Sequence, residues 1–367
     1  MDADFFQDIL SKIFKEERNI QAKEIVVSVP KGNSSTDDVF RSKIIYTSDR
    51  KCDKSISIII KKLSSDKEDP MKNSLVMRHS KSMSVEVDMH VNILPVMHRL
   101  LEVSGIKSKF GPQLYANISG PCDVLILEDL HEEYEIISER FDIDNMETVL
   151  TQLAQFHAAS YYMAAEDFTK EALKWPEFKD FHAQIQGLEE KFIDARNYLY
   201  RFDTDYNVLN HGDFHMRNIL FKIADNSIQH VIMHDFQTNV WCSPALDLIY
   251  TFYLIADSQT LHDCRSQMLS SYHRTFVSTL KSMGFMGQAP TLLDLNVELL
   301  RNGFIEIFVS IVFLPYQFVQ FASKQLQARI AKESSANARS LLYTIPEYQK
   351  AMKKLFETFL YKGFFDI

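Results

Sequence analysis

The stretch Leu209–Phe221, LNHGDFHMRNILF, places His, Asp, His, Arg and Asn side chains directly before an apolar run that is typical of a β-strand. A second apolar run follows within HVIMHDFQ, residues 230–237. Between the two runs, Asp225-Asn226 favours a tight chain reversal, because both residue types tolerate the backbone angles of short hairpin turns. The sequence therefore predicts a β-hairpin in which Ile219–Ile223 pairs with Ile228–His234.

The predicted hairpin gathers polar side chains at its open end. With the turn centred near Asp225, Asn218 lies nearly opposite Met233 and therefore next to Asp235, while Asp213 lies in the loop just before. Carboxylate and amide oxygens are hard ligands that suit Mg²⁺, an ion that usually shares its coordination shell with substrate phosphates. Asp213 is not needed in that shell and remains available to accept a proton from a hydroxyl group.

The spacing His211-x-Asp213-x-x-x-x-Asn218 is that of the protein-kinase catalytic loop, in which an Asp base is followed by a metal-binding Asn. Asp235-Phe236, at the end of the second predicted strand, takes the place of the Asp-Phe of the kinase metal-binding motif. We therefore expect Asp213 as the catalytic base, His211 as a hydrogen-bonding support of the catalytic loop, and Asn218 and Asp235 as Mg²⁺ ligands.

Neighbouring residues leave two alternatives open. His211 and His215 flank Asp213 and would also suit a metal hydrolase, although no further compact His cluster completes a zinc site. Asp247, in SPALDL, opens a predicted helix after a proline, which favours a role as the N-terminal cap. In kinase-like folds a comparable Asp also supports the catalytic loop, and the two roles are compatible.

Composition excludes several classes of protein. The 367 residues are 46% hydrophobic and 12% aromatic, with only 10 Gly and 10 Pro, which is typical of a compact globular protein with much helix. The net charge of −9 argues against a nucleic-acid partner, because such a protein needs concentrated basic surface. The four cysteines form no C-x-x-C pair and no zinc-ligand spacing, so we expect reduced thiols inside the cell.

We expect neither an export signal nor a membrane span. The first residues, MDADFFQDILSKIFKEER, carry acids before a short apolar periodicity, which favours an amphipathic helix over a secretory signal. The most hydrophobic stretch, Phe304–Val319, is interrupted by Glu306 and Pro315 and is shorter than the roughly 20 apolar residues that a bilayer requires. The sequence therefore predicts a cytoplasmic protein, and we expect a monomer.

The predicted secondary structure changes from strands to helices after the first third of the chain. Residues 24–63 alternate β-branched runs with turn-rich breaks, as short antiparallel strands do. Helical periodicity follows over Ser82–Val103, where Pro95 must kink or interrupt the helix. DVLILEDL, residues 123–130, predicts one more strand, and beyond it the chain is mostly helical apart from the hairpin. Helices are expected at residues 145–168, 179–200, 245–256, 263–284, 292–319 and 348–360.

This order predicts an α+β, bilobal fold. A small antiparallel-sheet lobe, residues 1–127, would precede a large and mainly helical lobe, residues 128–367, with a cleft between them.

Four segments together resemble a known family. They are LNHGDFHMRNILF at residues 209–221, LILEDL at residues 125–130, LAQFHAAS at residues 153–160 and HDFQTNVWCSPALDLIYTFY at residues 234–253. In content and order they are similar to the ecdysteroid kinase-like family of arthropods, whose wider relatives are choline-kinase-like and aminoglycoside-phosphotransferase-like enzymes. The resemblance covers most of the chain and implies an ATP-dependent small-molecule kinase with a protein-kinase-like fold.

The resemblance also implies roles for residues outside the hairpin. Lys61, which ends the apolar run SISIII, would pair with the ATP phosphates, and Glu86 would orient it. Lys62 is a rival, and a lysine at a strand end is otherwise a solvated terminus. The backbone of the connecting strand would lie against adenine, around Glu128, Asp129 and Leu130.

The segment expected to cover the phosphates departs from the usual composition. KGNSSTDDVFRSKIIY, residues 31–46, contains a single glycine, Gly32, and two acids, Asp37 and Asp38. Glycine favours close approach of the backbone to phosphate, and nearby carboxylates repel it. This segment favours an alternative in which the kinase fold is catalytically silent and binds a hormone or partner. The retained Asp213, Asn218 and Asp235 argue against that alternative.

The leading function implied by the resemblance is transfer of the γ-phosphate of ATP, with Mg²⁺, to a hydroxyl of a lipophilic alcohol. The acceptor would be an ecdysteroid, another steroid or a xenobiotic, which suggests a role in detoxification. A choline- or ethanolamine-type kinase is a further alternative, and choline would require an aromatic cage with acids around its quaternary ammonium group.

Overall fold

The computed structural model describes residues 3–14, 20–29, 39–48, 53–63, 82–118, 123–137, 139–172, 206–225, 227–331 and 341–364. Gly32, Asp37 and Asp38 of the expected phosphate loop, Asn226 of the hairpin turn and the helix expected at residues 179–200 lie outside these ranges.

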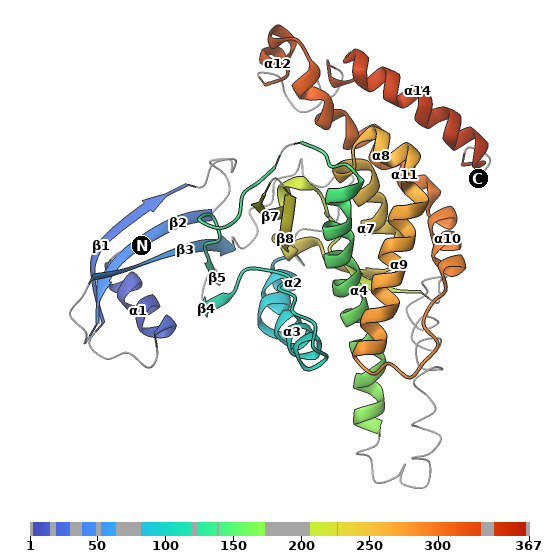
Figure 1. Cartoon of the computed structure of the whole chain (residues 1–367). Helices are drawn as coiled ribbons and strands as arrows, with labels where there is room; N and C mark the ends of the chain where they lie inside the picture. The colour runs from blue at the N-terminus through green and yellow to red at the C-terminus, as the bar shows by residue number, and fades with distance from the viewer. Residues whose placement is uncertain are drawn as a thin grey trace. The chain divides into compact units, whose positions relative to one another are not determined.

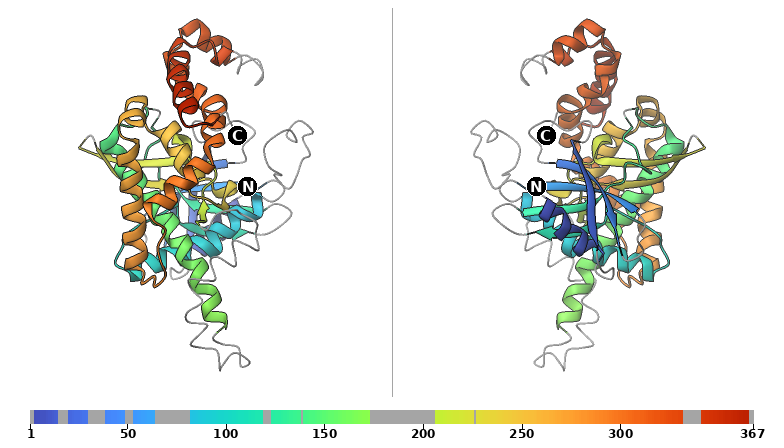
Figure 2. Two further views of the ribbon diagram at one scale, coloured as in Figure 1. Left: turned by 90° about the vertical axis from the view of Figure 1, so that its right-hand side faces the viewer. Right: turned by 90° about the vertical axis from the view of Figure 1, so that its left-hand side faces the viewer.

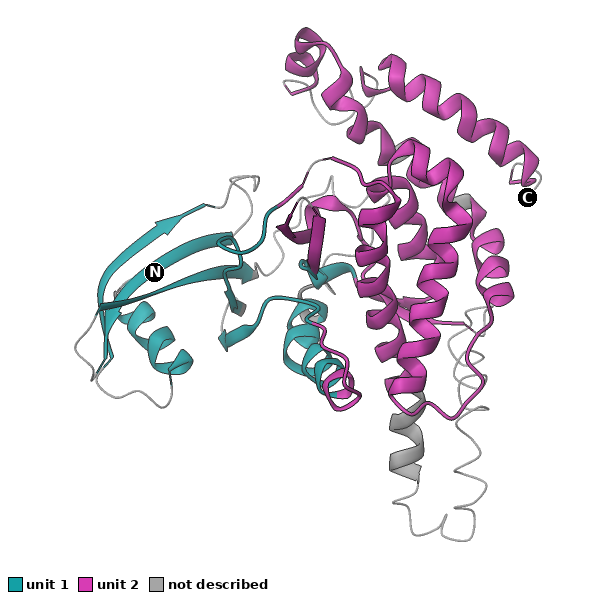
Figure 3. Cartoon of the chain, viewed as in Figure 1, with its two compact units in different colours: residues 1–99, 109–135, 232–238 teal, residues 100–108, 136–231, 239–367 magenta. Residues whose placement is uncertain are grey.

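The chain divides into two compact units (Figure 3). Unit 1 comprises residues 1–99, 109–135 and 232–238, and unit 2 comprises residues 100–108, 136–231 and 239–367. Unit 1 therefore takes in the segment that contains Asp235. The lobe boundary between residues 127 and 128 stays a prediction.

Unit 1 is built on a five-stranded sheet in the order β1-β2-β3-β5-β4 (Figure 1). Every neighbouring pair is antiparallel, as the alternating runs of residues 24–63 predict. Strand β4 was not expected from the sequence, because a five-residue strand that contains Asn carries little signal of its own. The strands are β1 (Gln21–Ser28), β2 (Val39–Thr47), β3 (Asp53–Leu63), β4 (Leu114–Ile118) and β5 (Asp123–Glu128).

Helix α1 (Ala3–Ile13) covers one face of this sheet, as the turned view in Figure 2 shows. Its buried side chains Phe6, Ile9 and Leu10 recur at helical spacing and form one apolar stripe. Full burial of each such side chain stabilises the fold by roughly 1.5–3 kcal/mol. The predicted N-terminal amphipathic helix is thereby confirmed. The stripe packs into one core with Ile44, Tyr46, Ile58, Ile60 and Ile126 of the sheet.

The helix predicted over Ser82–Val103 is interrupted, as expected from Pro95. It consists of α2 (Ser82–Asp88), a π-helical turn (Met89–Ile93) and α3 (Leu94–Val103). Pro95 has no N–H, and its ring excludes the carbonyl of the residue four positions before it. The backbone therefore widens just before the proline, and the N–H of Leu94 reaches back five residues to the carbonyl of Met89.

Unit 2 is mainly helical, and α4 (Ile143–Ala172) and α9 (Arg265–Ser282) pack along each other (Figure 1). The predicted hairpin is confirmed as β7 (Ile219–Ala224) and β8 (Ser227–Met233), whose last two residues belong to unit 1. The other helices are α7 (Ala245–Tyr250), which continues as a π-helical turn (Thr251–Ile255), α8 (Ser258–Asp263), α10 (Leu292–Arg301), α11 (Gly303–Val312), α12 (Lys324–Ile330) and α14 (Pro346–Tyr361).

Two details of unit 2 differ from the prediction. The single helix expected over residues 292–319 is divided into α10, α11 and a 3₁₀ helix (Leu314–Phe321). The first break lies at Asn302, and Pro315 lacks the N–H that would continue the regular ladder. A two-stranded sheet of β6 (Val208–Asn210) and β9 (Val240–Cys242) was missed. Each of its strands has only three residues, which is too short for a periodic pattern.

A five-stranded antiparallel sheet followed by a mainly helical C-terminal region is the architecture of the protein-kinase-like fold. The expected fold class is therefore confirmed. Within the described ranges, no helix has the combination of length and apolar composition needed to span a bilayer.

The start of α11 makes a stability prediction. A Cβ atom on Gly303 would overlap the ring of Phe364, which is itself buried. We expect Gly303→Ala to lower the free energy of unfolding by about 1–3 kcal/mol, measured by denaturant titration. In a Phe364→Ala background the overlap is gone, and the same glycine substitution should cost nothing. Equal costs in both backgrounds would contradict this explanation.

Candidate active site

In unit 1, the ammonium group of Lys61 bridges two carboxylates from distant parts of the chain. Its Nζ lies 2.9 Å from Oε1 and 2.8 Å from Oε2 of Glu86, which is on α2. The same Nζ lies 2.6 Å from Oδ1 of Asp235, in the segment after β8. The structure therefore brings together the predicted metal ligand Asp235 and the two residues, Lys61 and Glu86, to which the resemblance gives a phosphate-binding role.

Burial and charge act against each other at this bridge. Burial by itself lowers the pKa of Lys61, but the charges of Glu86 and Asp235 outweigh it, and the net effect raises the pKa. Burial raises the pKa of Glu86, although the positive charge of Lys61 opposes this. With both acids ionised, one cation faces two carboxylates. The net negative charge suits a further cation at Asp235.

Lys62, the rival of Lys61, lies on the other face of β3, because successive side chains of a strand alternate. Its ammonium group is 5.4 Å from the centre of the Phe40 ring. The structure thus places Lys61, and not Lys62, at Glu86.

Asp235 has an unusual backbone conformation. Its φ of 67° lies in the left-handed region, where Asp is one of the better-tolerated residues but still costs on the order of 1 kcal/mol. The next residue, Phe236, is fully buried, and a Cβ on Gly111 would come within 2.9 Å of its ring. The ring also meets His90 edge to face, with centroids 5.6 Å apart. Close packing of Phe236 therefore holds the strained residue before it.

In unit 2, the loop after β6 holds the predicted base. The amide nitrogen of Asn218 donates to Oδ2 of Asp213 at 3.0 Å and to its backbone oxygen at 2.9 Å. This contact turns the amide oxygen of Asn218 away from the carboxylate. Nε2 of His215 lies 3.3 Å from the other carboxylate oxygen of Asp213. Because the backbone N–H of Arg217 donates to Nδ1 of His215, neutral His215 carries its proton on Nε2, facing Asp213.

His211, the other residue expected at this loop, is fully buried and packs against Phe214 with centroids 5.9 Å apart. Its backbone N–H donates to Asp247 at 2.6 Å. This placement suits the expected support of the loop better than proton transfer with solvent.

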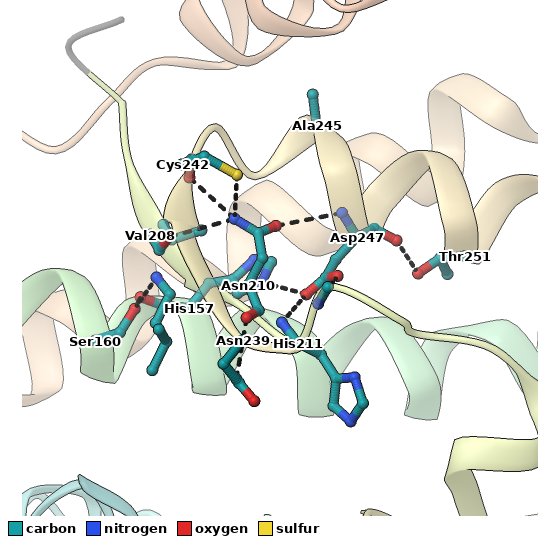
Figure 4. Close-up of polar contacts among 12 residues, drawn as sticks. His157, Ser160, Val208, Asn210, His211, Asn239, Cys242, Ala245, Asp247 and Thr251 are labelled. Atoms are coloured by element: carbon teal, nitrogen blue, oxygen red, sulfur yellow. Dashed lines mark hydrogen bonds and ion pairs between the residues drawn. The ribbon is translucent and has the colours of Figure 1, made fainter. Parts of the chain in front are cut away.

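Asp247 supports the loop and does not cap its helix, so the capping interpretation is wrong. The N-cap of α7 is Pro244, which has no side-chain cap, and Asp247 is the third residue of the helix. Its buried carboxylate accepts the N–H groups of His211 at 2.6 Å and Gly212 at 3.0 Å, as Figure 4 shows in part. The carboxylate also lies 3.2 Å from Nε2 of His157 on α4.

Asn210 is a second support that was not expected from the sequence (Figure 4). Its side-chain oxygen accepts the N–H of Asp247 at 3.2 Å, and its amide nitrogen donates to the carbonyls of Cys242 at 3.0 Å and Ser243 at 3.2 Å. Asn210 thus joins β6, β9 and α7 at the origin of the loop. In the sequence, only its position directly before His211 could have indicated that Asn210 supports the loop. Its hydrogen-bond partners are about 30 residues away along the chain.

The segment after β5, back in unit 1, is held through its side chains. Glu128 accepts Nζ of Lys109 at 2.5 Å and the N–H of Gln113 at 3.0 Å. The carboxylate of Asp129 pairs with Arg41 at 2.8 Å and its side chain is only 2% exposed. Leu130 is also buried. With both carboxylates engaged, the backbone is the part of this segment that is suited to contact a nucleotide.

Two overlapping segments, residues 31–174 and 166–285, match the profile of the ecdysteroid kinase-like family and together span well over half of the chain. The chain belongs to this family. The resemblance noted in the sequence is thereby confirmed. No curated protein matches the chain.

Several solved structures are similar to this one. The GDP and kanamycin complex of APH(2″)-IIia is 10% identical, with 95% of this chain and 99% of that chain covered and a TM-score of 0.38. The aminoglycoside phosphotransferase APH(3″)-Id of Streptomyces rimosus, with ADP and streptomycin, is 14% identical, with 70% and 88% covered and a TM-score of 0.29. A putative fructosamine-3-kinase of Haemophilus somnus is 11% identical, with 93% and 96% covered and a TM-score of 0.36.

The family and the fold are together those of a kinase-fold phosphotransferase that acts on small molecules.

Asp247 makes a prediction about the rigidity of the loop. Asp247→Asn removes the charge that two backbone N–H groups share, so we expect a loss of about 2–4 kcal/mol in the free energy of unfolding. Hydrogen exchange at the amides of His211 and Gly212 should accelerate. Asp257→Asn is the matched control, because Asp257 caps α8 by accepting the N–H of Thr260 and has no contact with the loop backbone among the described residues. Equal losses and unchanged exchange would indicate that Asp247 acts as a simple cap.

His90 makes a prediction about pH. Burial, followed by the charge of Lys61, lowers the pKa of His90 from 6.5 to about 4. The unfolded chain therefore takes up a proton first, and stability falls as the pH is lowered from 6.5 to 4. The loss from this group is about 3 kcal/mol. Unfolding titrations of His90→Leu should show a pH dependence that is shallower by this amount, whereas parallel curves would contradict the prediction.

Proposed function

We propose that the protein transfers the γ-phosphate of ATP to a hydroxyl group of a lipophilic alcohol. The observation that carries the proposal is the Lys61 ammonium held between Glu86 and Asp235, since a kinase requires a lysine fixed by a glutamate and a carboxylate for its metal ion. The family supports a small-molecule acceptor.

The nucleotide roles of Lys61, Glu86 and Asp235 follow from the donor set in unit 1, and the role of Asn218 stays the one that the sequence predicts. Lys61 would neutralise the phosphates, and Glu86 would keep it in place when the phosphates compete for its ammonium group. Asp235 and the amide oxygen of Asn218 are hard oxygen donors that fit Mg²⁺. When bound, the ion would neutralise charge on the phosphates.

Asp213 would orient the acceptor hydroxyl and accept its proton. Asn218 and His215 each contact one of its carboxylate oxygens, so the carboxylate has a fixed direction. Such positioning contributes more to phosphoryl transfer than strong basicity, because the reaction depends mainly on alignment and charge neutralisation.

Aromatic side chains near Asp213 support a lipophilic acceptor. Burial raises the pKa of Tyr250, and the negative charges of Asp213 and Asp247 raise it further, so this phenol is within electrostatic range of both acids. Phe313 lies 5.7 Å from Tyr250 between ring centroids, and Phe308 lies 5.7 Å from Phe313. Phe308 is 40% exposed. The three rings run from Tyr250 to the partly exposed Phe308, and such an apolar row would suit a steroid or an apolar xenobiotic.

The sequence extends the proposal to a cytoplasmic, monomeric enzyme that modifies such compounds in detoxification. Its apolar acceptor class is tested by incubation with Mg²⁺·ATP and a panel of ecdysteroids, other sterols, choline and aminoglycosides. Mass spectrometry would then detect phosphorylated products. We expect products from the sterol group. Phosphorylation of choline or aminoglycosides alone would contradict the acceptor class, and nucleotide binding without any product would favour a catalytically silent binding protein.

Asp213 gives the sharpest prediction about the chemical step. Asp213→Asn keeps the size of the side chain but loses the charge that attracts the proton, so turnover should fall by roughly 10² to 10⁴. Affinity for Mg²⁺·ATP should change little. Asp225→Asn is the matched control, because Asp225 is exposed in the hairpin turn at a φ of 52°, which Asn also tolerates. Loss of nucleotide affinity with near-normal turnover would make Asp213 a binding residue instead.

A further inference from the structure

One face of the sheet in unit 1 carries two polar clusters, one at Ser57 and one at Lys61 of strand β3. Side chains alternate along a strand, so Ser57, Ile59 and Lys61 of β3 share this face. Lys61 forms the bridge to Glu86 and Asp235 at one end. Ser57 donates to Asp129 at 2.6 Å at the other end. The two ends of this row are about 13 Å apart along the strand, which is comparable with an extended nucleotide.

The register of the sheet brings further residues onto the same face. Ile59 pairs with Arg41 of β2 and with Leu127 of β5, and residues directly opposite each other share a face. Asp129 follows two residues after Leu127. Along this face, the cation Lys61 is therefore followed by the apolar side chains of Ile59 and Leu127 and then by the carboxylate of Asp129. The donors that hold this carboxylate are called the clamp below.

The carboxylate of Asp129 is held by donors from three segments. Nε of Arg41 donates to Oδ2 at 2.8 Å and Nη2 donates to Oδ1 at 3.3 Å. The hydroxyl of Ser57 donates to Oδ2. The backbone N–H of His131 donates to Oδ1 at 3.3 Å, and Nδ1 of its ring lies 2.9 Å from Oδ2. A carboxylate that is only 2% exposed needs this compensation, because an unpaired buried charge is strongly destabilising.

We propose that Arg41 and Ser57 are positioning residues that hold the backbone of residues 128–130 as the base-binding edge of the nucleotide site. The inference rests on the proposed function and on the nucleotide orientation that the family resemblance implies. In that orientation the base lies over the partly buried Ile59 toward Asp129, and the phosphates lie at Lys61. Asp129 itself does not contact the base, because its side chain is occupied by the clamp.

The orientation separates the effects of changes at the two ends. A change at the base end should weaken every ligand that contains the base, with or without phosphates. A change at the phosphate end should weaken only ligands with phosphates. Adenosine and ADP, titrated calorimetrically in the presence of Mg²⁺, are therefore the two probes.

We expect Arg41→Gln to raise the Kd of adenosine and of ADP by the same factor, about tenfold. Lys61→Met should raise the Kd of ADP and leave that of adenosine unchanged. Arg99→Gln is the matched control, because it is the same substitution at an arginine that is exposed on α3 and lies outside the sheet. It should leave both affinities unchanged. Ser57→Ala removes one donor only and should raise both Kd values about threefold. If Arg41→Gln does not fold, Ser57→Ala tests whether the clamp positions the base-binding backbone.

A folded Arg41→Gln or Ser57→Ala protein with a lower melting temperature and unchanged adenosine affinity would overturn the proposal, because the clamp would then serve stability alone. A wild-type protein that binds neither probe would overturn both this proposal and the proposed function. If the wild type binds both probes and the variants behave as expected, the clamp stands even if no acceptor is phosphorylated. In that case only the proposed phosphoryl transfer fails.

Discussion

The ion pairs of Lys61 are the constraint on which the arrangement of unit 1 depends. A largely buried ammonium group is stable only with charged partners, and here Glu86 and Asp235 supply them from positions 25 and 174 residues away in the sequence. The bridge fixes β3 to α2 and to the segment after β8. The close packing of Phe236 on Gly111 then holds Asp235 in its left-handed conformation. The same face of β3 carries Ser57, so one strand sets the spacing between the predicted phosphate and base positions.

In unit 2, the loop that contains Asp213 has little regular secondary structure and must be held by side chains. Buried backbone N–H groups require acceptors, and the carboxylate of Asp247 supplies two of them. Asn210 ties the start of the loop to β9 and α7 through both ends of its amide. Asp213 therefore follows two residues whose backbone N–H groups are held by the same buried carboxylate. The side-chain contacts of Asn218 and His215 then set the direction of its carboxylate.

Sequence patterns predicted those parts of this structure that depend on local periodicity. Three features were predicted correctly: the hairpin, the N-terminal helix and the interruption at Pro95. Strand and helix periods and proline geometry act within a few residues, so a local pattern is enough to reveal them. The family resemblance implied the roles of Lys61 and Glu86, and the hairpin pattern predicted the position of Asp235. The short sheet of β6 and β9 and the function of Asn210 were missed, since their partners are distant in the sequence. Asp247 was ambiguous for the same reason: a helix-start pattern says nothing about acceptors for a loop 35 residues away.

The central claim is that the Lys61 bridge is the phosphate-binding position of a kinase. A crystal structure with Mg²⁺ and a non-hydrolysable ATP analogue tests it most directly. We expect Lys61 to keep its contact with Glu86, to exchange Asp235 for phosphate oxygens, and to leave Asp235 facing the metal ion. A nucleotide bound elsewhere, with the contact between Lys61 and Asp235 unchanged, would contradict the claim.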